Sequence, residues 1–321
     1  MAAAMEHYLV AMAITAGLYA LMALGTNIIW GMAGLVNLGV VGFVGVGAYV
    51  SALLTLKLGW PIAAGMAAGA LAAACVGVLV GIITVNLRGD YLAIVTLGFA
   101  ESVRIVTSNE IWLANGTDGL SGIPGPWRAD LGPHAFNLFY LGIVVAVVAV
   151  AFFVAERLCY SPFGRVLRAI RDDQQVASVA GKYVLAFKLK AFAIGTGALG
   201  LAGALYAHFT SYIAPDVFVP LLTLYIKLSL LAGGLGNNRG ALLGAVAVVF
   251  FLESTRFIVP LVPWLTHVQG AALREILISV TLLVILRFHT KGLIPERLMH
   301  PALPGETSPG SALPSRTGAT T

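Results

Sequence analysis

The sequence predicts an all-α membrane protein, a polytopic bundle of about eight to ten transmembrane helices, on the strength of two observations. Of the 321 residues, 59% are apolar and 10% are charged, and the mean hydropathy is +0.92. Soluble proteins carry about 25% charged residues, so this chain has too few charges to cover a water-facing surface. The second observation is that apolar runs of roughly 20 residues, the length that crosses a bilayer, follow one another along the chain.

The same composition excludes several classes of function. A soluble enzyme, a nucleic-acid-binding protein and a disordered protein all need more polar surface than this chain has. The formal charge of +5 matches the excess of Lys and Arg that membrane proteins carry in cytoplasmic loops. The lipid bilayer is therefore the expected surrounding, and no nucleic acid is expected as a partner.

Nine segments are apolar and long enough to span a bilayer. They are residues 8–31, 34–56, 60–87, 90–108, 135–156, 191–213, 217–236, 240–262 and 270–288. Only Gly31–Gly34 separates the first two, so one of them is expected to be broken or re-entrant. Most glycines in such runs allow helices to pack closely, as Gly240 and Gly244 would. Asn37 within the glycine-rich run instead favours a broken helix beside a translocation path.

The charges of the loops set the orientation. Residues 156–190 hold seven basic and three acidic side chains, whereas residues 109–134 hold three acids and one Arg. The positive-inside rule therefore places the loop at about 157–190 in the cytoplasm and the loop at about 109–134 outside. With nine spans the N-terminus is also outside. Residues 1–294 read as one transmembrane domain, and residues 295–321, rich in Pro, Ser, Thr and Gly, read as a disordered cytoplasmic tail.

The cytoplasmic loop has the pattern of one or two short amphipathic helices. Ser161-Pro162 is a good helix start and Gly181 a good stop. Between them basic side chains recur every three residues, beside apolar strips. Two interpretations stay open: an interfacial helix held by anionic lipid, or a docking helix for a cytoplasmic partner.

Ionisable residues also occur inside the expected spans. Glu101 and Arg104 are three residues apart on one helix, so this pair can neutralise itself, as Glu253 and Arg256 can. Lys227 has no acidic partner at helical spacing in segment 217–236. A lone cation in lipid is by default a functional candidate, and the neighbouring Thr223 and Tyr225 could line the same cavity.

The motifs of several enzyme classes are missing from the sequence. It contains no Gly-x-x-x-x-Gly-Lys-Ser/Thr phosphate loop, no His-Glu-x-x-His and no Gly-x-Ser-x-Gly. Asp172-Asp173 is a lone acidic pair, whereas a membrane prenyltransferase needs two acid-rich clusters to hold Mg²⁺ and a diphosphate. Catalytic residues, a metal site and a cofactor are therefore not expected.

Several stretches, in order, together resemble the inner-membrane permease subunits of branched-chain amino acid ABC importers, and most closely the larger of the two permeases in that system. They are Asn37-Leu-Gly39 through Gly45-Val-Gly47-Ala48-Tyr49, Arg88-Gly89-Asp90-Tyr91, Gly116-Thr117-Asp118-Gly119, Ser161-Pro162-Phe163-Gly164-Arg165, Ala202-Gly203-Ala204-Leu205-Tyr206, Pro215-Asp216 and Gly233-Gly234-Leu235-Gly236.

The resemblance implies a multi-pass subunit of the bacterial inner (plasma) membrane that transports a small polar solute and catalyses no reaction itself. It implies a second, related permease as heterodimer partner, two P-loop ATPases at the cytoplasmic face and an external solute-binding protein. The basic loop then becomes the coupling element that meets an ATPase. Its candidate residues are Arg165, Arg168, Ala169, Asp172 and Gly181, and the candidates for the translocation pathway are Asn37, Tyr49, Tyr225 and Lys227.

Alternative functions remain at this point. Relatives often carry a Glu where Tyr225 aligns and an apolar residue where Lys227 aligns, so a permease for urea or short amides is an alternative to one for branched-chain amino acids. An ion-coupled secondary transporter would need neither ATP nor a docking helix. A membrane enzyme would need a cluster of polar residues at one depth, which the sequence does not provide.

Overall fold

The computed structural model describes residues 2–84, 87, 89–258, 269, 272–273, 276–277, 279–281, 284 and 292–296. Most of the expected ninth span, 270–288, and nearly all of the tail lie outside these residues. The all-α prediction is confirmed: apart from one pair of two-residue strands, the regular structure of the described part is helical. Seven helices in this part are long and apolar enough to cross a membrane.

The spans follow the expected order along the chain. They are α1 (Ala2–Thr26) with its continuation η1 (Asn27–Met32), α2 (Val40–Lys57), α3 (Ile62–Thr84), α4 (Gly89–Asn109), α6 (Pro133–Tyr160), α9 (Val184–Thr210), and η3 (Pro215–Val217) with α10 (Pro220–Gly233). A further helix, α11 (Asn238–Ile258), overlaps the expected eighth segment. The short elements are α5 (Ile111–Ala114), η2 (Gly116–Asp118), β1 (Leu120–Ser121), α7 (Pro162–Asp172), α8 (Gln174–Val179) and β2 (Tyr212–Ile213).

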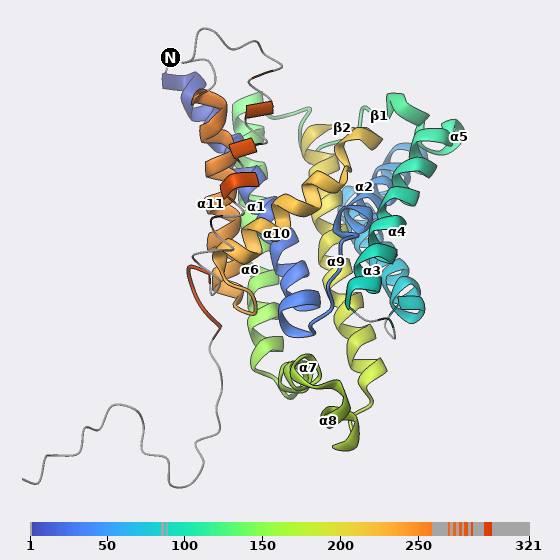
Figure 1. The fold of residues 1–321 in the computed structure, drawn as a ribbon. Coiled ribbons are helices and arrows are strands. Elements are labelled where there is room, and N and C mark those ends of the chain that lie inside the picture. Colours follow the sequence, from blue (N-terminus) through green and yellow to red (C-terminus); the bar gives the residue numbers. More distant parts are fainter. Residues whose placement is uncertain are drawn as a thin grey trace, which may run out of the picture.

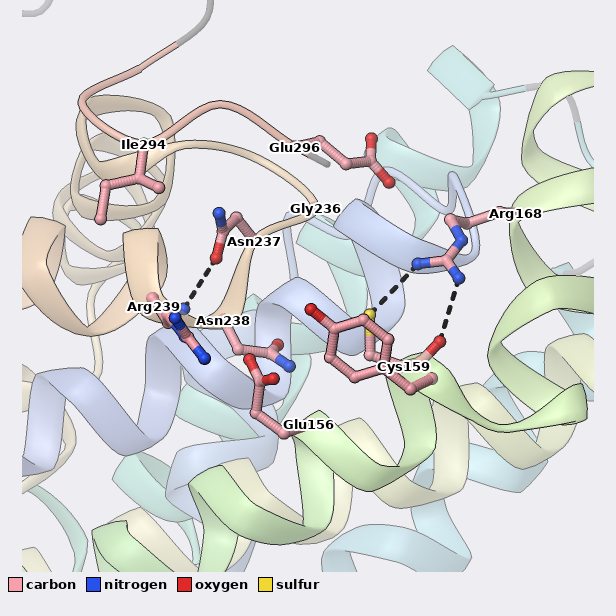
Figure 2. Close-up of a pocket in the computed structure, with 10 residues that line it drawn as sticks. Glu156, Cys159, Arg168, Gly236, Asn237, Asn238, Arg239, Ile294 and Glu296 are labelled. Carbon is pink, nitrogen blue, oxygen red and sulfur yellow. Dashed lines mark hydrogen bonds between the residues drawn. The ribbon is translucent and has the colours of Figure 1, made fainter. Parts of the chain in front are cut away.

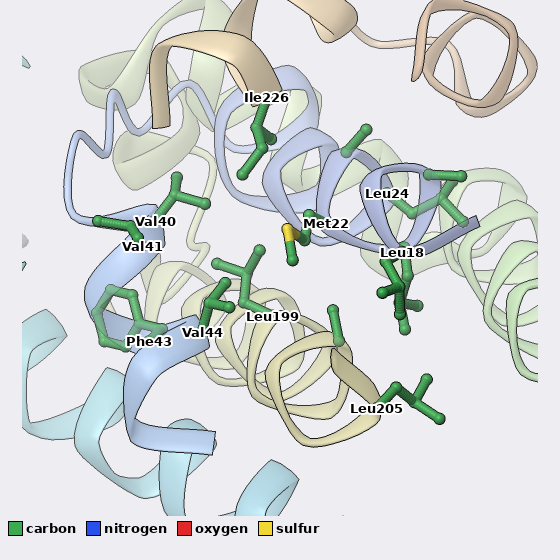
Figure 3. Close-up of a cluster of buried hydrophobic side chains, with 14 of the residues drawn as sticks. Leu18, Met22, Leu24, Val40, Val41, Phe43, Val44, Leu199, Leu205 and Ile226 are labelled. Carbon is green, nitrogen blue, oxygen red and sulfur yellow. The ribbon is translucent and has the colours of Figure 1, made fainter. Parts of the chain in front are cut away.

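Helix α9 lies at the centre of the bundle, with α1, α2 and α3 packed around it. Glycines allow these helices to approach closely, because a Cβ atom at Gly203 would overlap the backbone of Val44, and one at Gly47 would overlap Gly200. Between the close contacts lie fully buried apolar side chains. Figure 3 shows part of this core, including Leu18, Met22, Val44, Leu199, Leu205 and Ile226.

Helices α10 and α11 form a second closely packed pair. Gly233 on α10 faces Gly240 and Gly244 on α11, which confirms the packing role expected for the last two. Helix α11 also lies along α1, and α6 packs on α1 as well.

The two ends of the bundle carry different structures (Figure 1). Helices α7 and α8 lie at one end, and α5 and the β1–β2 pair lie at the other. The strands are antiparallel, with Leu120 opposite Ile213. Helix α1 begins at the β1–β2 end, where His7 Nδ1 lies 3.1 Å from His134 Nδ1. With α7 and α8 in the cytoplasm, as the charges predict, α1 begins outside, in agreement with the nine-span count.

Candidate functional site

The chain is not helical between α1 and α2. Helix α1 widens into the π-helix η1 and ends, Gly34 adopts a φ of +70°, and regular helix resumes only at Val40. The open backbone is held by hydroxyls of two other spans. Leu38 N donates to Thr96 Oγ1 of α4 at 3.0 Å, and Val41 N donates to Thr223 Oγ1 of α10 at 3.2 Å. Irregular backbone at membrane depth needs such partners, so this is the broken segment that the sequence predicts.

Asn37 lies within this break and is 1% exposed. Its Oδ1 accepts a hydrogen bond from Gly39 N at 2.7 Å. Its Nδ2 has no hydrogen-bond partner among the described residues. Leaving a buried polar group unsatisfied costs about 1–3 kcal/mol, so this amide can donate to a water or solute molecule, and its place on the pathway stays a prediction.

Tyr49 lies in the same region, nearer the external end. Helix α2 runs outward from Val40 to Lys57, whose Nζ donates to the carbonyl of Trp112 on α5 at 2.7 Å. The Tyr49 ring lies 5.8 Å from the ring of Phe218, which follows η3. Its hydroxyl is buried close to the side chain of Thr107 on α4. Among the described residues Asn37 thus keeps an open donor within the break, and Tyr49 lies further along α2.

Lys227 and Tyr225 lie on different faces of α10. Lys227 comes one turn after Thr223, on the same face, and is 8% exposed; its Nζ lies 4.7 Å from the centroid of the Trp30 ring of η1. Tyr225 is turned about 200° away from Lys227 around the helix. It lines a cavity of about 280 Å³ between α1, α9 and α10. The structure therefore places Lys227 beside the break at the end of α1, and Tyr225 elsewhere.

Lys227→Met is expected to make the protein more stable and, at the same time, to lower transport. Among the described residues the buried ammonium contacts an aromatic face but no carboxylate. Removing such a charge raises the free energy of unfolding by about 1 kcal/mol or more. Uptake should fall if Lys227 serves the pathway. Thermal unfolding of the purified protein and initial uptake rates measure the two effects. Lys227→Arg, which keeps the cation, is the control, and unchanged uptake in Lys227→Met would remove the residue from the pathway.

The loop predicted to be cytoplasmic folds as two helices, α7 and α8. Ser161 caps α7, its Oγ accepting from Gly164 N at 3.4 Å, and Pro162 is the first helical residue. Asp173 caps α8, its Oδ1 accepting from Gln175 N at 2.8 Å. On the inner face of α7, Leu167 and Ile170 are buried.

The outer face of the helix pair is exposed. Arg165, Ala169 and Asp172 share one exposed side of α7 at helical spacing. On α8, Val176 is 64% exposed and Val179 is 90% exposed. Gly181 follows α8 with a φ of +75°, a backbone conformation that favours glycine. Large apolar side chains rarely stand this exposed at the water-facing end of a membrane protein, so this face is suited to a partner surface.

Arg168 points inward, away from that face. Its Nη2 donates to the Cys159 carbonyl at 3.0 Å, and its Nη1 lies 3.2 Å from Cys159 Sγ (Figure 2). The guanidinium therefore satisfies a carbonyl at the end of α6 and holds α7 against that helix. A direct contact of Arg168 with a partner remains a sequence-based prediction, whereas its structural role in this chain is clear.

Arg171 connects α7 to the break and was not among the expected coupling residues. Its Nη1 donates to the Gly31 carbonyl at 2.5 Å and lies 2.9 Å from Glu296 Oε2. Asn27 ties the same part of η1 to the turn before α11: its Oδ1 accepts from Gly236 N at 2.9 Å, and its Nδ2 donates to Asn238 Oδ1 at 2.9 Å. Helix α7, the broken helix and the turn between α10 and α11 are thus joined by hydrogen bonds.

Beside these links lies a cavity of about 220 Å³, to which many polar and charged residues contribute (Figure 2). Its lining combines residues far apart in sequence: Glu156, Cys159, Tyr160, Arg168, Gly236, Asn237, Asn238, Arg239, Ile294 and Glu296. The sequence contains one signal for the role of Arg171, namely the arginines that recur every three residues. This repeat does not show which arginine reaches η1.

At the β1–β2 end, predicted to be external, the loop 109–134 is fixed to α9. Arg128 lies over the ring of Phe136, 4.2 Å from its centroid, and donates to the Phe209 carbonyl and to Ser211. Burial lowers the pKa of the Arg128 guanidinium. His208 Nδ1 lies 2.7 Å from the carbonyl of Pro124. The external loop is therefore a shaped surface attached to the central helix.

Comparison with known proteins agrees with this arrangement. The family model described as "Branched-chain amino acid transport system / permease component" matches residues 8–286. The chain belongs to this family. The resemblance seen in the sequence is thereby confirmed, and within the family the seven apolar helices make the chain a multi-pass membrane protein.

Three relatives illustrate the similarity. The high-affinity branched-chain amino acid transport system permease protein LivM of Escherichia coli (strain K12) is 33% identical over 74% of this chain. The probable branched-chain amino acid transport permease protein LivM of Methanocaldococcus jannaschii is 28% identical over 88% of this chain and 91% of its own length. The permease protein LivH of Escherichia coli (strain K12) is 24% identical over 71% of this chain and 78% of its own length.

The match covers 61% of the length of the Escherichia coli LivM relative, so this chain spans about three fifths of that protein. No solved structure matches the chain.

Proposed function

We propose that the chain is one of two permease subunits of an ATP-driven importer that moves branched-chain amino acids across the plasma membrane. The observation that carries the proposal is the helix pair α7–α8, exposed on its outer face and tied on its inner face to the broken helix by Arg171. Such a pair can receive movement from a cytoplasmic partner and pass it to the membrane region. The chain itself performs no covalent chemistry.

The expected partners follow from the same features. The outer face of α7–α8 meets a P-loop ATPase, which supplies the phosphate loop that this sequence lacks. Similarity to relatives of two kinds, LivM and LivH, supports a heterodimer with a second, related permease. The fixed external loop would receive a solute-binding protein. Alternating access then takes place between the two permeases, with Asn37, Tyr49 and Lys227 beside the path.

Arg171→Ala is expected to uncouple the importer. The change removes the hydrogen bond to the Gly31 carbonyl and the ion pair with Glu296, so α7 loses its link to the break. A hydrogen bond from a charged group contributes about 1.5–3 kcal/mol, which corresponds to about tenfold or more in transport per ATP hydrolysed. Uptake and ATP hydrolysis are measured on the same proteoliposomes.

Arg171→Lys keeps the charge but lacks the planar fork, so it should restore transport in part. Equal transport per ATP in Arg171→Ala and wild type would show that coupling does not pass through this contact.

Affinity purification in mild detergent tests the partner assignments. The tagged chain is extracted from native membranes, and the bound proteins are identified by mass spectrometry. A second apolar permease and P-loop ATPases, at near-equal amounts, are the expected result. Recovery of the chain alone or as a homo-oligomer, under conditions that keep a known ABC importer intact, would contradict the proposal.

A further inference from the structure

Helix α4 presents a long face that no described part of the chain covers. The exposed residues recur at helical spacing, and among them are Tyr91, Ile94, Gly98, Ser102 and Ile105. A Cβ atom at Gly98 would meet nothing within 4 Å. Helix α4 is also the least apolar of the seven spans, whereas α6, with its broad exposed apolar face, is the most apolar. The face of α4 is therefore less suited to lipid than that of α6.

An ion pair lies along one edge of this face. Arg104 Nη2 lies 2.5 Å from Glu101 Oε1, and Arg104 Nε donates to Glu101 Oε2 at 3.0 Å. The side chains are 29% and 37% exposed, respectively. A helix rises about 1.5 Å per residue, so Glu101 lies roughly 12 Å from the end of α4 at Asn109. Hydrocarbon solvates such charges poorly, so this position needs a protein or aqueous surrounding.

Further polar groups lie in the same outer half of the molecule. The exposed Asp216 of η3 is near enough to act electrostatically on Arg104. Thr107 donates to the Arg104 carbonyl at 2.9 Å. The Tyr49 hydroxyl, on the neighbouring α2, lies close to Thr107 as well. Beside these groups, Phe218 and Val103 both lie within 4 Å of a Cβ built at Gly45, so an apolar wall adjoins the polar ones.

We propose that Glu101 and Arg104 form a binding site for the zwitterionic main chain of an amino acid, on the face where this chain meets the second permease. The Arg104 guanidinium binds the α-carboxylate as a two-pronged donor, and Glu101 accepts from the α-ammonium. Between transport events the two side chains neutralise each other. An ion pair can thus exchange for a zwitterion without leaving a net charge at membrane depth.

This assignment rests on the proposed function and deepens it, because it specifies the substrate class. Urea and short amides are neutral and carry neither an ammonium nor a carboxylate, so they have no need of a matched pair of opposite charges. A pair that served only as a contact with the second permease would instead be required for assembly and not for the transport step.

The test uses the complete importer, both permeases with the ATPases and binding protein, reconstituted in proteoliposomes with radiolabelled L-leucine. Glu101→Gln and Arg104→Gln leave one unpaired charge each, so the double variant Glu101→Gln/Arg104→Gln, which leaves none, is measured beside them. Glu253→Gln is the matched control, because this carboxylate also sits in a long apolar helix, where it accepts from Tyr8 Oη at 2.5 Å.

The expected result is a loss of about tenfold or more in the maximal rate of leucine uptake in all three variants, with complex yield and ATP hydrolysis within about twofold of wild type. The Glu253 variant transports normally. Uptake by the double variant within twofold of wild type would overturn the site. Loss of the second permease from the double variant would also overturn it, showing an interface contact instead. A wild-type complex that assembles and hydrolyses ATP but moves no leucine would overturn the substrate of the proposed function as well.

Discussion

Val179→Asp is expected to weaken binding of the ATPase subunits, so that they no longer co-purify with the importer, and to abolish ATP-driven uptake. Val179 is 90% exposed at the end of α8, beside the exposed Val176. Burying a valine side chain contributes about 1.5–3 kcal/mol, and an aspartate in the same contact adds an unpaired charge. The affinity for the ATPase should therefore fall at least about tenfold. Co-purification from detergent and uptake in proteoliposomes measure the loss.

Ile111→Asp is the matched control for this prediction. Ile111 is 73% exposed on α5, at the opposite end of the molecule, so the same kind of change is made far from α8. It should leave the recovery of ATPase unchanged. If Val179→Asp retained its ATPases and its uptake, the outer face of α8 would not be the docking surface.

The largest expected effect on stability is that of Gly203→Val. Gly203 lies on α9 against the backbone of Val44, where even a Cβ atom would overlap the carbonyl group. Helices α2 and α9 would have to separate, and the packing of α1 and α3 on α9 would be disturbed with them. Such overpacking typically costs about 1–3 kcal/mol and occasionally more, and contact with backbone atoms that cannot move aside places this change at the upper end. The thermal midpoint of the purified protein and the yield of folded protein should both drop.

Gly142→Val makes the same change on α6, where a Cβ atom meets nothing within 4 Å. Its effect should stay within about 0.5 kcal/mol, because Val and Gly differ by only a few tenths of a kcal/mol in helix propensity, in favour of Val. Equal stability of the two variants would show that α2 and α9 do not approach as closely as described.

The spans could be predicted from the sequence because burial in lipid imposes a simple requirement of length and apolar composition. Lys57 and Gly59–Pro61, for example, mark the turn between two apolar runs, and the structure places α2 and α3 on either side. The break near Asn37 was predictable for a related reason. Too few residues separate the first two apolar runs for an ordinary loop, and a polar amide lies in the second.

The roles of individual polar residues were harder to predict, because they depend on contacts between distant segments. The arginines of α7 repeat every three residues, yet Arg165 is exposed, Arg168 bonds to the end of α6 and Arg171 reaches Gly31. Only the packing of α7 against other helices distinguishes them. Tyr225 and Lys227 lie on different faces of α10 because two residues along a helix turn a side chain by about 200°. Only the packing of α10 shows which of these faces meets the break at the end of α1.

One measurement tests the central claim directly: uptake of L-leucine by proteoliposomes containing the chain, its partner permease, the ATPases and the binding protein. If the chain is one permease subunit of an ATP-driven importer, uptake requires ATP on the side of the membrane where α7 and α8 lie. Uptake then persists when ionophores remove all ion gradients. Uptake by the chain without the ATPases, driven by an ion gradient and abolished by an uncoupler while ATP is held constant, would contradict the account and identify a secondary transporter.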